Sequence, residues 1–179
     1  MVTIMSLSLQ STIFDLKMKL RIVFALFFIF FLTMVQGKNL NQNFDRSAFY
    51  EVMASGNMEA INEELILLNS ASIDEKDAYE GALLMRKSGL LKIPAEKLKY
   101  FKKGRIKLET ALLKDSSNGE YHFLRLTIQE HAPKIVKYST ELENDKQYII
   151  KSFKELLPVV QQAIFDYCKK SKILDAKDF

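Results

Sequence analysis

Three polar side chains stand out in residues 120–131, a segment whose central residues are otherwise mostly apolar or aromatic. If that stretch is a helix, His122, Arg125 and Gln129 project together from one side, since a helix turns through about 100° per residue. A guanidinium can hold an anionic group, an amide can orient it, and a histidine makes the contact sensitive to pH. The stripe is therefore either the solvent side of a central helix or the lining of a cleft. We expect Arg125 to be buried beside a carboxylate from another helix.

Two further arginines fall on apolar faces of predicted helices. On a helical wheel Arg105 lies within a stripe of leucine and phenylalanine, and Arg86 lies beside small and aromatic residues. Both are predicted to be partly buried, because a guanidinium can rest its stem on apolar surface while its head binds a carboxylate. An internal ion pair is one interpretation and an anion-binding pocket is the other. The candidate partners are Glu109, Glu80 and Asp77.

Charge is distributed unevenly along the chain. Residues 45–80 hold nine acidic and two basic residues, whereas residues 86–107 hold nine basic residues and one acidic residue, Glu96. Such a basic face is either a solvated surface that pairs loosely with the acidic segment or a contact for anionic lipid or an acidic partner. Its residues on the predicted fourth helix are Lys99, Lys102, Lys103 and Lys107.

The residue types needed for metal binding or nucleophilic catalysis lack the usual spacing. His122 and His131 are nine residues apart and would lie on opposite sides of one helix. No paired-cysteine or histidine zinc motif, acidic calcium loop, phosphate loop or glycine-framed serine is found. Cys168 is the only cysteine, which excludes an intrachain disulfide and predicts a packing role. The sequence therefore predicts no cofactor and no catalytic residue.

The segment Met18–Gly37 has the features of a signal peptide. Its apolar stretch, residues 22–35, follows basic residues and is too short to cross a bilayer of roughly 30 Å. Small residues precede a predicted cleavage site after Gly37. Residues 1–17 are interpreted as an extension from an upstream start, with Met18 as the true initiator. Residues 1–37 are thus predicted to be extension plus signal peptide.

Residues 38–179 are predicted to form one exported domain. They contain 23 basic and 21 acidic residues, giving a net charge of 23 − 21 = +2. A nearly balanced charge argues against a nucleic-acid binder. The residue directly after the predicted cleavage site is not a cysteine, so no lipid anchor is expected. Export without disulfides fits a bacterial periplasm.

Apolar residues recur at helical spacing through most of this domain, which predicts an all-α fold. Asp45 and Asn57 can cap two helices joined by Gly56. The capping box Ser72–Glu75 predicts a third helix, which should end at Ser88–Gly89. The small residues of its face, which should allow close approach of another helix, are Ala78, Gly81 and Ala82.

Two central helices are expected next. Pro94 suits the first turn of a fourth helix that ends near Lys114. A second capping box, Ser117–Glu120, favours a helix for residues 120–131, although their alternation is also compatible with a strand. The inward stripe of the fourth helix is predicted to contain Leu98, Phe101, Leu108 and Leu112.

A long sixth helix is predicted from about Thr140, with a kink at Pro158. The expected architecture is a compact bundle of about six helices in antiparallel pairs. Its final helix should place in the core Phe153, Leu156, Val160 and Ile164.

Two resemblances accompany these patterns. The junction Ala111–Tyr121 resembles a boundary between tetratricopeptide repeats, at one place in the chain only. The run Phe123–Pro133, followed by Tyr138, Asp145–Lys146 and a long C-terminal helix, resembles a group of small exported helical bacterial proteins. That group has no assigned activity, so the resemblance implies a helical fold and export but no mechanism.

Together these features predict an exported, non-catalytic interaction or accessory protein of the cell envelope. A protein partner is expected to bind a helical groove or the basic face. The alternative is a binder of a small anionic ligand or an anionic membrane surface, through the buried arginines or the basic fourth helix. A closed polar pocket would favour a ligand, and an open apolar groove would favour a protein.

Overall fold

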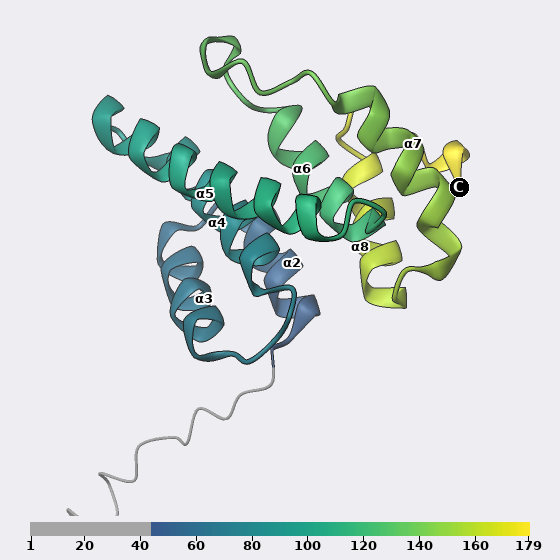
Figure 1. Cartoon of the computed structure of the whole chain (residues 1–179), viewed down its shortest axis with the longest axis horizontal. Coiled ribbons are helices and arrows are strands. Elements are labelled where there is room, and N and C mark those ends of the chain that lie inside the picture. The colour runs from purple at the N-terminus through teal and green to yellow at the C-terminus, as the bar shows by residue number, and fades with distance from the viewer. Residues whose placement is uncertain (1–43) are drawn as a thin grey trace, which may run out of the picture. The chain divides into compact units, whose positions relative to one another are not determined.

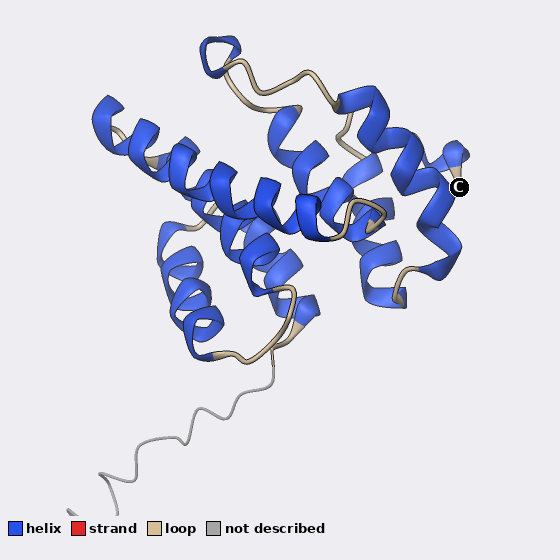
Figure 2. Ribbon diagram, viewed as in Figure 1, coloured by secondary structure: helices blue, strands red, loops and turns tan. Residues whose placement is uncertain are grey.

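A computed structural model describes residues 44–179, and the predicted extension and signal peptide lie outside these residues. The described part contains helices and loops and no strand (Figures 1 and 2). Its seven α-helices and three 3-10 helices are α2 Arg46–Ser55, α3 Met58–Ser70, α4 Lys76–Leu90, α5 Pro94–Lys114, α6 Gly119–Gln129, η1 Lys134–Val136, α7 Leu142–Ser152, η2 Phe153–Glu155, α8 Pro158–Cys168 and η3 Ala176–Asp178. The all-α prediction is confirmed, and residues 120–131 are helical through Gln129.

The first two helices begin and end at residues that the sequence indicates. The Asp45 carboxylate accepts hydrogen bonds from the backbone of Ser47 and Ala48, and the Asn57 side chain accepts one from Ala60. Gly56, between the helices, has a φ of 63°, a left-handed conformation that glycine adopts without strain. These caps confirm the predicted helix pair.

Neither predicted capping box forms. Glu75 stands at the start of α4 without a side-chain cap, and α4 runs to Leu90, past the predicted end. At α6 the cap is Asn118, whose side-chain oxygen accepts from the backbone of Glu120 and Tyr121. The carboxylate of Glu120 instead accepts hydrogen bonds from hydroxyl groups in the interior. It therefore does not bind the backbone at the start of the helix, as a capping box would require.

The predicted long C-terminal helix is two helices. α7 ends at Ser152, and residues 153–155 tighten into a 3-10 turn. Leu156 and Leu157 then adopt extended conformations, with ψ of 150° and 144°. Proline disfavours helical geometry in the residue before it and suits the first turn of a helix. Pro158 therefore begins α8 rather than kinking a continuous helix.

α4 and α5 approach each other through glycine, as the small-residue face predicts. A Cβ built on Gly104 would lie 2.5 Å from the Gly81 carbonyl oxygen, and one on Gly81 would lie 2.7 Å from the Leu108 backbone nitrogen. Of the predicted α5 stripe, Phe101, Leu108 and Leu112 are buried, whereas Leu98 is 47% exposed. The predicted stripe is therefore buried from Phe101 onward and exposed at Leu98.

α6 is the central helix of the described residues. Ten of its eleven residues are buried, so it has no solvent side. Tyr121, Leu124 and Ile128 join a core cluster with α2–α5, whereas Phe123 and Leu126 join a second cluster with α7 and α8.

None of the helices within residues 44–179 combines the length and apolar character that a membrane span needs.

Candidate functional site

Arg125 lies in a buried ion cluster between three helices. Its Nε and Nη2 donate to Asp145 of α7, at 2.9 Å to Oδ2 and 2.6 Å to Oδ1, and its Nη1 donates to Glu109 Oε2 of α5 at 3.0 Å. Burial lowers the pKa of Arg125, but the hydrogen bonds and charges of these carboxylates outweigh it and raise the pKa overall. Tyr138 also donates to Glu109, at 2.6 Å. The predicted burial and pairing of Arg125 are confirmed.

His122 occupies the other side of the same carboxylate. Its Nδ1 lies 2.6 Å from Asp145 Oδ1, its Nε2 lies 2.9 Å from the backbone oxygen of Ser116, and its ring stacks on Tyr148 at 4.1 Å. Both ring nitrogens face acceptors, so a doubly protonated ring can donate to both, whereas a neutral ring can donate to one. The fully buried Asp145 thus joins two side chains of α6 to α7.

Gln129, the third member of the stripe, takes no part in this cluster. Its side chain is 2% exposed, and neither its amide nitrogen nor its oxygen has a hydrogen-bond partner among the described residues. The interpretation of the stripe as a solvent face is therefore wrong. The stripe faces other helices, and His122 and Arg125 already form hydrogen bonds with protein groups.

Arg105 and Arg86 do not form the expected internal ion pairs. Arg105 is exposed, and its guanidinium carbon lies 4.8 Å from the centre of the Tyr138 ring. Arg86 is half-buried and donates from Nε to the backbone oxygen of Met53 at 3.0 Å, with no carboxylate in ion-pair range within residues 44–179. The predicted partners face elsewhere: Glu109 binds Arg125, while Asp77 and Glu80 face α5.

The four lysines predicted as one basic face divide between two sides of α5. Lys107 reaches inward and pairs with Asp77 at 2.8 Å and Glu80 at 3.1 Å. Lys103 reaches Glu80 only at 3.8 Å. Lys99 and Lys102 are exposed and form no ion pair within the described residues. The basic face is therefore narrower than predicted, because α4 neutralises its inner side.

A groove of about 780 Å³ lies among α2, α4, α6 and α8. Arg86 stands in its wall, and the charged groups Glu51, Asp166 and Lys170 also line it. Lys170 rests over the ring of Tyr167 at 5.5 Å. Most of the other lining side chains are apolar or aromatic, including Met53, Met85, Phe101, Phe123, Leu124, Ile128 and Val159. No sequence pattern identifies the residues of this groove, because they come from distant parts of the chain.

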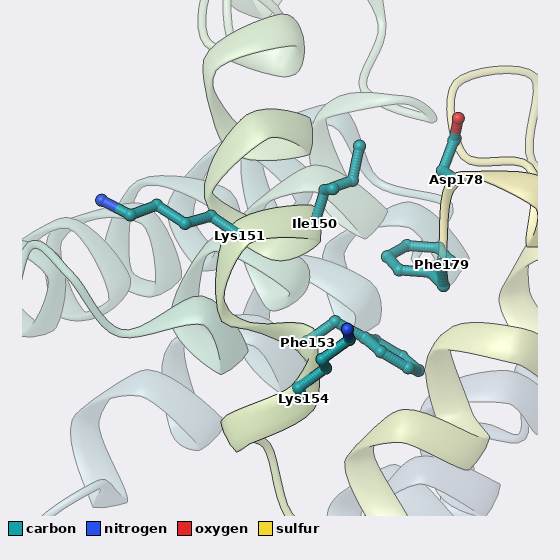
Figure 3. Close-up of a pocket in the computed structure, with 6 residues that line it drawn as sticks. All are labelled: Ile150, Lys151, Phe153, Lys154, Asp178 and Phe179. Carbon is teal, nitrogen blue, oxygen red and sulfur yellow. The ribbon is translucent and has the colours of Figure 1, made fainter.

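A smaller cavity of about 380 Å³ lies near the C-terminus, lined by Ile150, Lys151, Phe153, Lys154, Asp178 and Phe179 (Figure 3). The rings of Phe153 and Phe179 pack at 4.5 Å. Asp178 is paired with Lys146 at 2.8 Å, and Lys151 points away from the other labelled side chains. No set of free polar groups converges there, so this cavity is a weak candidate for a site.

A second buried polar cluster surrounds Glu120 and was also missed. Its carboxylate accepts from the hydroxyls of Tyr79 at 2.6 Å and Tyr50 at 2.8 Å, and Arg46 lies 3.7 Å away. Burial raises the pKa of Glu120 despite these donors. The predicted capping box would instead have placed this carboxylate against the backbone at the start of the helix.

The residues suited to metal or thiol chemistry remain apart. Within residues 44–179 no group of three or more histidine, cysteine or acidic side chains could hold a metal ion. Cys168 is half-buried at the end of α8 and packs against the second core cluster. Burial raises the pKa of its thiol, away from the reactive thiolate form.

No family model, curated protein or solved structure matches this chain.

Proposed function

We propose that the chain is an exported, non-catalytic interaction protein of the cell envelope. Its groove holds an apolar segment of a partner protein, and Arg86 binds a carboxylate on that segment. The observation that carries the proposal is a half-buried guanidinium, without an acidic partner among the described residues, in the wall of a largely apolar groove.

The lining of the groove supports a protein segment as the occupant. A helix or extended peptide binds such a surface by placing side chains against apolar walls contributed by several helices. The groove contains two methionines, Met53 and Met85, and their flexible side chains can adapt to an irregular partner. A small-ligand site also has mostly apolar walls with a few polar groups, but it usually encloses most of the ligand surface, whereas a peptide lies along an open groove.

Arg86 supplies the charge complementarity. The Met53 backbone oxygen holds its Nε, which leaves the Nη groups as donors. Asp166 and Glu51 line the same groove but lie beyond ion-pair range of Arg86. A carboxylate supplied by a partner would accept charge-assisted hydrogen bonds from this guanidinium in a partly dehydrated setting.

A non-catalytic role is supported by the placement of the two histidines. His131 lines the groove, but its Nδ1 lies 3.1 Å from the backbone oxygen of Thr127, and it forms no ion pair with a carboxylate within residues 44–179. His122 and Asp145 bind each other, and neither lines the groove.

Export is proposed from the segment Met18–Gly37, with periplasmic or secreted protein as the product. Replacing Phe27 and Phe28 by Asp should retain the precursor in the cytoplasm, as fractionation would show.

The proposal includes an arrangement of helices in antiparallel pairs. It is supported at α4 and α5 by ordered contacts: Asp77, early in α4, meets Lys107, late in α5. Lys87, late in α4, lies 4.6 Å from the ring centre of Tyr100, early in α5. Such pairing would leave helix ends and faces available to form the groove.

The test is co-purification of the tagged protein from envelope extracts, with Arg86→Gln and Arg105→Gln as matched variants. A partner retained by the unchanged protein and by Arg105→Gln should be lost with Arg86→Gln, because only Arg86 lines the groove. The carboxylate is then located by replacing acidic residues of the partner segment with their amides. Equal recovery of the partner by both variants would contradict the role of Arg86. If isolated acetate or another small carboxylate binds with the same dependence on Arg86, the anionic-ligand alternative is favoured instead.

A further inference from the structure

α5 has a second apolar stripe, on its outward side. Leu98, Ile106 and Leu113 are 47%, 67% and 84% exposed, whereas the inner side of the same helix is buried. Ile106 and Leu113, seven residues apart, lie nearly in line along the helix, whereas Leu98 is turned by about 60–80° toward the side of Phe101. No described element covers them. The exposed side of this 21-residue helix thus carries three large apolar side chains among charged ones.

Unpaired basic residues flank this stripe. Lys99 and Lys102 are exposed and have no acidic partner within the described residues. The only acidic residue between Lys92 and Lys107 is Glu96. The acids of α4, Asp77 and Glu80, lie on the inner side, where Lys107 occupies them. The outward side of α5 therefore combines apolar side chains with positive charge.

The loop around η1 lies beside α5 and carries the same kinds of side chain. Ile135 is 88% exposed, and Lys134 and Lys137 on either side of it are exposed as well. In Figure 1 this loop projects beyond the start of α7. Tyr138 joins the loop to α5, with its ring 5.5 Å from that of Phe101. The loop is thus held beside the helix.

We propose that this surface, formed by the outward stripe of α5, its flanking lysines and the loop 134–137, docks on an anionic lipid bilayer. A helix lying in the plane of a membrane places apolar side chains at the acyl boundary while lysines bind anionic headgroups. The surface is a protruding helix and loop with no groove, which suits a broad headgroup layer better than a peptide. Export would bring it to envelope membranes. This docking is independent of the groove and of Arg86.

The test is flotation of the purified protein with vesicles of phosphatidylglycerol and phosphatidylethanolamine, compared with vesicles of phosphatidylcholine. The protein should float with the anionic vesicles, and added salt should weaken the association. Lys99→Glu with Lys102→Glu should reduce binding by about 30-fold or more, because each basic side chain at such a surface contributes roughly fivefold. The matched control reverses two exposed lysines elsewhere, Lys154 and Lys172.

The apolar contribution is tested separately. Ile106→Ser should weaken binding to anionic vesicles, and adding Ile135→Ser should weaken it further. Ile66→Ser is the matched control, since Ile66 is 66% exposed and lies on α3. All these positions are exposed, so the fold is retained, which the thermal midpoint checks. No flotation at low salt, equal binding to phosphatidylcholine, or an equal loss in the two lysine pairs would each overturn the proposal.

Discussion

Asp145 shows how one residue can join several helices. It is fully buried and accepts from Arg125 and His122, two side chains of α6 that are nearly one turn apart. Glu109 completes the pairing of Arg125 from α5. A buried ion pair is costly to dehydrate, but removing one partner leaves the other charge uncompensated in the interior. The cluster therefore secures the position of α6 whatever the net energy of its formation.

The first prediction concerns this carboxylate. Asp145→Asn keeps the shape of the side chain but removes the charge that faces Arg125 and His122. The free energy of unfolding should fall by about 3–5 kcal/mol, as for other buried ion pairs that lose one partner. Chemical denaturation measures it. The control is Asp74→Asn, at an exposed site, which should leave the midpoint unchanged. Equal midpoints for both variants would mean that the cluster is not a structural clamp.

At the scale of elements, the contact between α4 and α5 depends on the absence of side chains at two positions. The backbones of Gly81 and Gly104 meet where a Cβ atom would collide with backbone atoms. Backbone atoms cannot move aside as the end of a flexible side chain can. The pair of glycines therefore determines how closely these two helices pack.

The second prediction compares glycines on and off this contact. Gly104→Ala should lower the free energy of unfolding by about 1–3 kcal/mol, since its methyl group would push α4 and α5 apart. Gly89→Ala meets no atom within 4 Å and lies inside α4, so it should stabilise by roughly 0.5–1 kcal/mol. Thermal unfolding of the two variants provides the comparison. A stabilising Gly104→Ala would show that the helices can separate without loss.

At the scale of the whole molecule, a buried carboxylate, Glu120, and a partly buried one, Glu130, link stability to pH in opposite directions. Burial raises the pKa of Glu120 above its ordinary value of 4.5, so its contribution is present at low pH and is lost as pH rises through the folded pKa. For Glu130 burial also raises the pKa. The backbone N–H of Lys172 and the hydroxyls of Ser171 and Tyr167 outweigh that effect and lower it. Its contribution is present above 4.5 and is lost as pH falls.

The third prediction follows from Glu130, which ties the end of α6 to α8 and to residues 171–172. Glu130→Gln should be less stable than the unchanged protein at neutral pH, because the amide accepts these donors more weakly. The difference should shrink as pH falls below 4.5, because the carboxylate is then protonated through its depressed folded pKa. Urea midpoints at several pH values measure it. A difference that is constant with pH would contradict the ionised role of Glu130.

Several features could be predicted from sequence because their causes are local. Asp45 and Asn57 cap helices through backbone groups two or three residues away, and Pro94 starts α5 because its ring suits a first turn. The burial of Arg125 also followed from its neighbours, since the apolar residues around α6 leave no broad polar side. In each case the deciding contacts lie within one or two helical turns.

Tertiary structure decided which atoms those elements bring together. Glu120 accepts hydrogen bonds from the hydroxyls of Tyr50 and Tyr79 instead of forming the predicted capping box. Arg105 is exposed, and Glu109, a carboxylate predicted for it, binds Arg125. Arg86 lines a groove instead of pairing with a carboxylate. A helical wheel gives the direction of a side chain but not the helix opposite it. The all-helical nature of residues 44–179 was therefore readable from local periodicity, whereas the ion cluster and the groove depend on packing between distant segments.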